Sequence, residues 1–383
     1  MVSPFDLIAL LLLAAGVIGL VNDRWIGLPQ PVCLLLAAIG VSLAVMAIDP
    51  LIPSRDLTGA ARAVLAGVDL PRFLLDGVLA FLLFAASLHV GLDELRTNKW
   101  TILALATAGV IISTVLFGVL LWAVLQAGPA PVPLRWCFVL GAILAPTDAV
   151  VVDGLLRRVD LPASLKAAIS GESLFNDGVG VVIFLVALAG AQGATGLVGH
   201  GVIAARLLIE SAGGGAIGVA TGLLAVAAIR RTANYNVALT VSLALVLVTY
   251  RSAQLAGVSG PIAVVAAGLC VGNERRAGEA RQGEVIAFWS VVDELLNAML
   301  FLLIGFETFA IGVERARFPA VLLAIPITLL ARAISVAVPM LVLSIRTHDR
   351  GRGIAVLTWA GLRGGVSVPS HSACRPARTA RCW

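Results

Sequence analysis

Four polar residues lie close together between Gly171 and Gly180, namely Glu172, Ser173, Asn176 and Asp177. Apolar sequence flanks them on both sides, so the whole stretch is long enough to form a membrane-spanning helix. Glu172 is four residues from Asn176, and Ser173 is four residues from Asp177, so all four side chains share one helix face. An ionisable group at membrane depth costs about 3 kcal/mol or more and rarely lies there without a function. We therefore predict an ion site with Asp177 as its titrating centre.

The composition of the whole chain is that of a membrane protein. Of its 383 residues, 60% are hydrophobic and 13% are charged, whereas a soluble domain carries about 25% charged residues. The net charge is +5, and the basic residues form no long run. The sequence also contains no glycine loop of the Walker type, so nucleic-acid and nucleotide binding have no support. The five cysteines show neither a disulfide framework nor zinc spacing. We expect no cofactor.

Hydropathy predicts an all-α, polytopic membrane protein with about twelve spans. The predicted spans are approximately 4–22, 30–48, 71–92, 100–126, 132–153, 162–189, 200–229, 235–253, 257–273, 285–309, 318–346 and 351–369. Loops after odd-numbered spans carry about twice as many lysines and arginines as loops after even-numbered spans. By the positive-inside rule, the odd-numbered loops then face the cytoplasm and the N-terminus lies outside.

Two of these spans contain helix breakers near their middle. The span 132–153 carries Ala145-Pro146-Thr147-Asp148-Ala149, where the proline removes a backbone donor. The span 351–369 carries Gly361-Leu362-Arg363-Gly364-Gly365. If the seventh span links two repeats, the two broken spans occupy corresponding positions, and such pairs of interrupted helices are typical of a transporter's binding site.

The sequence changes character after the twelfth span, because residues 370–383 are polar and basic and end without a thirteenth apolar run. We expect residues 1–369 to form the transmembrane domain. Our hypothesis for residues 370–383 is an aberrant tail, produced by a frameshift that replaced the end of the twelfth span and removed the thirteenth. An intact, error-free reading frame in the DNA would contradict it.

Several motifs together resemble those of the monovalent cation–proton antiporters, the NhaP-type bacterial exchangers and their NHE-type animal relatives. They are Ala-Pro-Thr-Asp at 145–148, Gly-Glu-Ser-Leu-Phe-Asn-Asp-Gly-Val at 171–179, Phe-Trp-Ser-Val-Val-Asp-Glu-Leu-Leu-Asn-Ala-Met-Leu-Phe-Leu-Leu-Ile-Gly at 288–305, Ala331-Arg332, and Gly-Leu-Arg-Gly-Gly at 361–365. The resemblance implies an antiporter fold of thirteen spans with inverted repeats and two crossed, discontinuous helices. It also implies a homodimer in the bacterial inner membrane that exchanges Na⁺ or Li⁺ for H⁺.

By this resemblance, the family's ion-binding aspartate corresponds to Asp177, with Asn176 beside it. Ser173, Thr147 and Asp148 match positions at or next to the ion site. Sodium is a hard cation that binds oxygen ligands, and a carboxylate that holds either a proton or Na⁺ forces the two ions to exchange. Because Asn176 is neutral, each exchange trades one charge for one charge, and we predict electroneutral 1:1 antiport. The alternatives are a structural carboxylate at Asp177 and a helix-packing threonine at Thr147.

The same resemblance pairs Glu172 with Arg332. Neither charge is stable alone at mid-span, so we favour a structural ion pair between the sixth and eleventh spans over direct contact of Glu172 with the ion. Arg363 matches the arginine of the second crossed helix. Asp148 and Arg363 lie at the two breaks, where helix ends carry about half a charge each, and we expect these side chains to compensate that charge.

One departure from the family pattern leaves the ion preference open. Many NhaP-type proteins carry a glutamate in the third span, where this chain reads Phe84-Ala85-Ala86. K⁺/H⁺ antiport by the same mechanism is therefore an alternative. An alternative hypothesis from a different functional class is an enzyme, an intramembrane aspartyl protease that uses Asp148 and Asp177. No recognised protease motif surrounds either aspartate, so we predict a transporter and not an enzyme.

Overall fold

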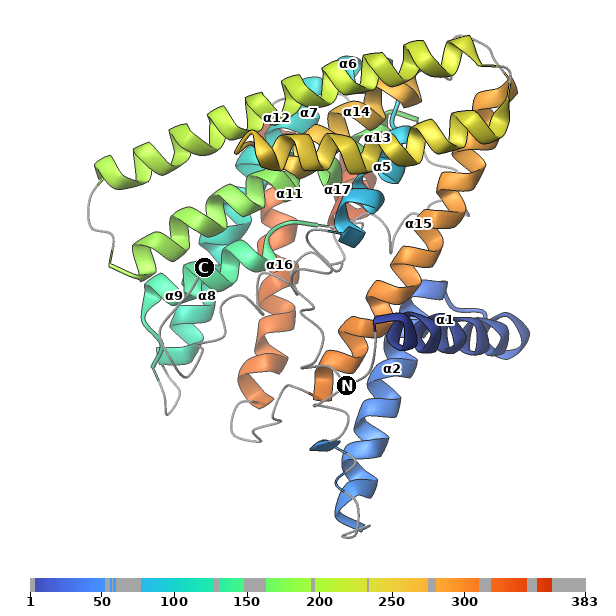
Figure 1. Cartoon of the computed structure of the whole chain (residues 1–383). Coiled ribbons are helices and arrows are strands. Elements are labelled where there is room, and N and C mark those ends of the chain that lie inside the picture. Colours follow the sequence, from blue (N-terminus) through green and yellow to red (C-terminus); the bar gives the residue numbers. More distant parts are fainter. Residues whose placement is uncertain are drawn as a thin grey trace.

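The structure is a computed structural model that describes residues 4–51, 56, 58–59, 77–126, 131–147, 163–193, 197–232, 234–274, 280–309, 318–342 and 350–359. Within these ranges the regular elements are all helices (Figure 1). The α-helices are α1 (Pro4–Val21), α2 (Gln30–Ile48), α5 (Leu79–His89), α6 (Leu92–Thr97), α7 (Lys99–Ala104), α8 (Val110–Gln126), α9 (Leu134–Leu144), α11 (Ala163–Ala191), α12 (Leu197–Arg231), α13 (Tyr235–Leu255), α14 (Gly260–Glu274), α15 (Ala280–Phe306), α16 (Phe318–Val342) and α17 (Arg350–Trp359).

Each of the twelve predicted spans contains at least one of these helices. In the described part of the chain, eight helical stretches are long and apolar enough to cross a membrane, and α5, α9 and α14 are shorter apolar helices. The span predicted at 100–126 is helical throughout, because a π-helical turn, η4 (Leu105–Gly109), joins α7 to α8. The all-helical membrane fold is confirmed, whereas the number of spans and the inverted repeat stay predictions.

The outer faces of the helices are apolar. Large aliphatic side chains such as Leu20 on α1, Leu224 on α12 and Val342 on α16 are 71–76% exposed. A water-soluble protein rarely leaves so many large apolar side chains uncovered. Lipid solvates such faces, and helices suit this environment because their backbone hydrogen bonds are satisfied within the segment.

Buried side chains divide the helices into two packed groups. The first, which we call the α15 group, comprises α1, α2, α5 and α12–α15 and shares two apolar cores. The second, the α11 group, comprises α8, α9, α11, α16 and α17 together with η4. Helices α6 and α7 lie between the groups, where aliphatic residues of α5 and α14 pack against Leu174 of α11.

Small residues hold α12 tightly against α14 within the α15 group. A Cβ atom on Gly218 would overlap the carbonyl group of Ala263, and one on Gly222 would lie 2.9 Å from the Cβ atom of Cys270. These two glycines therefore allow the close helix packing that small residues provide between membrane helices. On the same helix, Arg206 Nε donates to Glu210 Oε1 at 2.8 Å, an ion pair one helical turn apart.

Candidate ion site

The first predicted helix break lies beside the middle of α11. Helix α9 ends at Leu144, and residues 145–147 are not helical, which confirms the break predicted at Pro146. The proline ring packs directly against α11 at Gly180, where an added Cβ atom would overlap the ring. A glycine at this position therefore lets the broken span approach the polar segment of α11.

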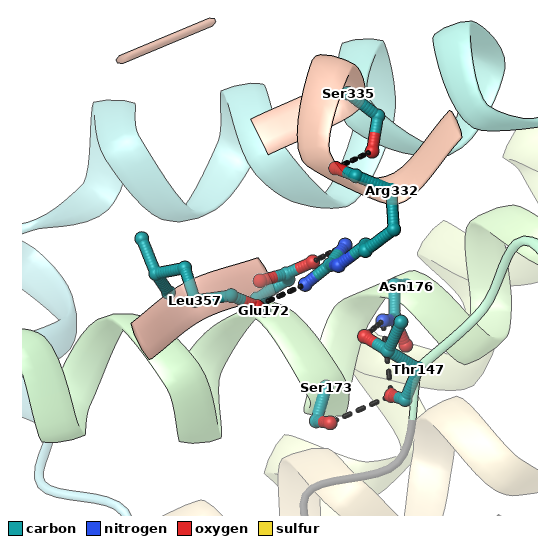
Figure 2. A network of polar contacts seen from close by, with 7 residues as sticks. All are labelled: Thr147, Glu172, Ser173, Asn176, Arg332, Ser335 and Leu357. Atoms are coloured by element: carbon teal, nitrogen blue, oxygen red, sulfur yellow. Dashed lines mark hydrogen bonds and ion pairs between the residues drawn. The ribbon is translucent and has the colours of Figure 1, made fainter. Parts of the chain in front are cut away.

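Two side chains of α11 bind the backbone that the break leaves free. Ser173 Oγ donates a hydrogen bond to the carbonyl oxygen of Thr147 at 2.7 Å (Figure 2). Asn176 Nδ2 donates to the same carbonyl at 3.1 Å and to Thr147 Oγ1 at 2.7 Å. Thr147 and Asn176 are both buried, at 5% and 0% exposure. The structure thus brings three of the five predicted ion-binding residues together.

The two polar atoms of the Asn176 side-chain amide differ in their hydrogen bonding. Its nitrogen must face Thr147, because the carbonyl oxygen there accepts hydrogen bonds and cannot donate one. Its oxygen, Oδ1, is consequently turned away, and it is buried without a hydrogen-bond partner in the described part of the chain. An unsatisfied buried acceptor costs about 1–3 kcal/mol. A bound cation is one partner that would satisfy it.

Three other predicted site residues are less fully described. Asp177 follows Asn176 within α11, one turn after Ser173, and its side chain lies outside the described part of the structure. Asp148 and Arg363 lie wholly outside the described residues, as does the second predicted break around Gly361. The roles assigned to these residues therefore stay predictions.

The two residues proposed as an ion pair are in contact across two helices. Arg332 on α16 donates from Nη1 to Glu172 Oε1 on α11 at 2.6 Å. Glu172 is 2% exposed and Arg332 is 6% exposed, so each charge lies in the interior with the other as its neighbour. Removing one partner of such a pair costs about 3–5 kcal/mol, because the remaining charge stays buried.

Two further contacts at the site were not predictable from the sequence. Arg332 Nη2 also donates to the carbonyl oxygen of Leu357 on α17 at 3.3 Å (Figure 2). Ser335 Oγ donates to the carbonyl of Arg332 at 2.9 Å, within α16. Both acceptors are main-chain oxygens, which every residue carries, so residue types alone do not reveal them.

Comparison with known proteins identifies the family. Residues 8–370 match the model of the sodium/hydrogen exchanger transmembrane family. The chain is 35% identical over 373 residues to the Na⁺/H⁺ antiporter NhaP of Pseudomonas aeruginosa, covering 95% of this chain and 87% of that protein. The chain belongs to the sodium/hydrogen exchanger family. It is also 30% identical over 334 residues to the Na⁺/H⁺ antiporter NhaS2 of Synechocystis, covering 85% of this chain and 56% of that longer protein.

The fold resembles that of a sodium proton antiporter of known structure. The sodium proton antiporter MjNhaP1 of Methanocaldococcus jannaschii superposes with a TM-score of 0.71 at 21% identity, over 96% of this chain and 83% of that one. A sodium/hydrogen exchanger is a transporter and not an enzyme, which removes the support for an intramembrane protease built on Asp148 and Asp177.

Proposed function

We propose that this exchanger-family chain transports Na⁺ or Li⁺ in one direction and H⁺ in the other, by alternating access around Asp177. The observation that carries the proposal is the cluster on α11 beside the helix break. There Ser173 and Asn176 fix the carbonyl of Thr147, and Asn176 Oδ1 is buried without a partner in the described part. Oxygen atoms held in this way, next to a carboxylate residue, suit a small hard cation.

The exchange follows from competition for one carboxylate. Asp177 holds a proton or a cation, and Asn176 beside it contributes an oxygen without a charge. Each cycle then moves one positive charge in each direction, so transport is electroneutral with 1:1 stoichiometry. Thr147 and Ser173 supply oxygens on either side of the break, and Asp148 and Arg363 compensate the charges of the helix ends.

Access alternates when the α11 group moves against the α15 group. The contact between the groups includes aliphatic side chains of α5 and α14 packed on Leu174. Such side chains slide past one another without breaking hydrogen bonds, whereas polar contacts tie α11 to α9 and α16 inside its own group. We infer that the ion site moves with the α11 group as one body.

Membership of the exchanger family, the apolar faces of the helices and the loop charges support a proposal for the oligomeric state and orientation of the transporter. We propose a homodimer in the bacterial inner membrane, with its N-terminus outside and its apolar faces against the lipid bilayer. The substrates are Na⁺ or Li⁺ and H⁺; we expect no cofactor and no nucleic-acid partner. Potassium remains the alternative cation, because carbonyl, hydroxyl and carboxylate oxygens also bind K⁺.

Transport by reconstituted protein tests the proposal. Vesicles containing the protein and a trapped pH dye would be exposed in turn to Na⁺, Li⁺ and K⁺. We expect Na⁺ or Li⁺ to drive proton movement in the parent and Asp177→Asn to abolish it. Glu210→Gln is the matched control, since it neutralises a carboxylate on α12 that pairs with Arg206. Full activity in Asp177→Asn would refute the proposal, and a response to K⁺ alone would replace sodium with potassium.

A further inference from the structure

Arg332 makes one more contact than an ion pair requires. Its Nη1 atom donates to Glu172 at 2.6 Å, and its Nη2 atom donates to the carbonyl of Leu357 at 3.3 Å. Leu357 lies on α17 (Arg350–Trp359), so this second bond joins Arg332 to the main chain of another helix.

We propose that Arg332 is a positioning residue for the ion site, because its guanidinium binds a main-chain carbonyl of α17 and the Glu172 carboxylate at the same time. Three helices meet at this one group: α16 carries it, α11 supplies the carboxylate and α17 supplies the carbonyl (Figure 2). A guanidinium suits this position, because its planar fork presents several fixed N–H groups to separate acceptors.

The surroundings strengthen both contacts. Leu105, Ile169, Val336 and Met340 form a buried apolar cluster with the Leu357 side chain, and Arg332 itself is 6% exposed. In such an environment the effective dielectric is low, so hydrogen bonds from a cation are stronger than they are in water. The guanidinium thereby fixes α17 at the level of Glu172, one helical turn before Asn176 on α11.

This role differs from that of a simple salt bridge in a way that can be measured. If Arg332 only paired with Glu172, exchanging the two residues in the double variant Glu172→Arg/Arg332→Glu would restore the structure. With the second contact, the exchange places a carboxylate against the Leu357 carbonyl oxygen and removes the donor to it. The exchanged protein should then keep a salt bridge and still lose the position of α17.

Hydrogen exchange of the α17 backbone, followed by mass spectrometry, tests the proposal without relying on transport. We expect amides of residues 350–359 to exchange at least about 10-fold faster in Arg332→Gln and in the double variant. Glu172→Gln keeps the guanidinium on Leu357, so its α17 amides should be accelerated less than those of Arg332→Gln. Equal acceleration in Glu172→Gln and Arg332→Gln would overturn the proposal, as would no acceleration in either.

A substitution in the backbone of α17 tests the contact between Arg332 and Leu357 even if the Arg332 variants fail to fold. Replacing the amide between residues 357 and 358 by an ester weakens the Leu357 carbonyl as an acceptor and leaves every side chain in place. The matched control is an ester between residues 356 and 357. We expect faster exchange of the α17 amides in the first protein than in the second, and equal exchange in the two would overturn the proposal.

The expected effect of Arg332 on Na⁺ transport rests on the proposed function, and it is measured separately as KM for Na⁺. A positioning role predicts that Arg332→Lys, which keeps one positive charge and loses the fork, raises KM for Na⁺ more than it lowers the maximal rate. A purely stabilising role would lower the amount of active protein and leave KM unchanged, and that result would overturn the positioning role. If Asp177→Asn retained activity, the proposed function would be wrong. Hydrogen exchange of α17 would still test the role of Arg332.

Discussion

The contact between Pro146 and Gly180 allows a direct test of how the break shapes the ion site. A Cβ atom added at Gly180 would overlap the proline ring, which is rigid and cannot rotate out of the way. A Cβ atom added at Gly178, two residues earlier on α11, would lie 3.7 Å from Cδ1 of Ile262, an ordinary van der Waals distance. The variants Gly180→Ala and Gly178→Ala are therefore a matched pair.

The magnitude follows from comparing the two variants. Each replacement of glycine by alanine inside a helix gains roughly 1 kcal/mol of helix propensity, and this gain is common to both. Overpacking at Gly180 costs about 1–3 kcal/mol more, through displacement of the broken span from α11. If that cost falls on the Na⁺-binding geometry at Thr147, it corresponds to a rise in KM of about 5- to 150-fold.

The assay is Na⁺-driven proton movement in vesicles, measured over a range of Na⁺ concentrations for the parent and both variants. Thermal unfolding in detergent serves as the control for general destabilisation. We expect Gly178→Ala to match the parent and Gly180→Ala to show a raised KM. If the two variants had the same KM within about 2-fold, a difference of only about 0.4 kcal/mol, close packing of the break would not set the site.

Three further predictions follow from the same contacts. Ser173→Ala removes one donor to the freed carbonyl, worth about 1 kcal/mol, so KM for Na⁺ in vesicles should rise about 5-fold, and an unchanged KM would contradict this. Gly218→Ala should lower the free energy of unfolding by about 1–3 kcal/mol, because the new Cβ atom would overlap Ala263. Gly215→Ala is its control, with no atom within 4 Å of the added Cβ, and equal thermal stability of the two would refute the packing argument. Since protons compete with Na⁺ for one carboxylate, lowering the pH should raise KM for Na⁺ without lowering the maximal rate, and a KM independent of pH would exclude competition.

Hydropathy predicted the helices well because the bilayer leaves few choices. A spanning segment must satisfy its own backbone hydrogen bonds, so a run of about 20 apolar residues predicts a helix. The break at Pro146 was predictable for a related reason, since proline lacks the N–H that a helix interior needs. The remaining uncertainty is at the ends: the span predicted at 100–126 begins at Lys99 in the structure, and that predicted at 257–273 begins at Gly260.

The site was predicted less completely, because its contacts join distant parts of the chain. Spacing on α11 placed Ser173 and Asn176 on one face, and resemblance to a family placed Thr147 at or next to the site, but the hydrogen bonds between them were not predicted. The role of Gly180 could not be predicted from the sequence, because it depends on which atoms lie opposite the glycine in the fold. The role of the Leu357 carbonyl could not be predicted either, because it depends on which side chain of α16 contacts it.

The contacts of α11 explain how one helix can hold an ion site steady while the site changes access. Glu172 ties it to α16, and one turn later Asn176 ties it to the break that follows α9. One partner is a helix and the other is the non-helical segment after α9, and both contacts lie within a single turn of α11, so a shift of either partner would disturb the oxygens around Asn176. Motion that preserves the site must carry α9, α11 and α16 together. The contact with α5 and α14 is then the surface where sliding disturbs the site least, because the contacts described there join aliphatic side chains. A disulfide between α5 and α11 across that contact should stop transport, whereas one between α8 and α9 inside the α11 group should not. Equal inhibition by the two cross-links would refute movement of the α11 group as one body.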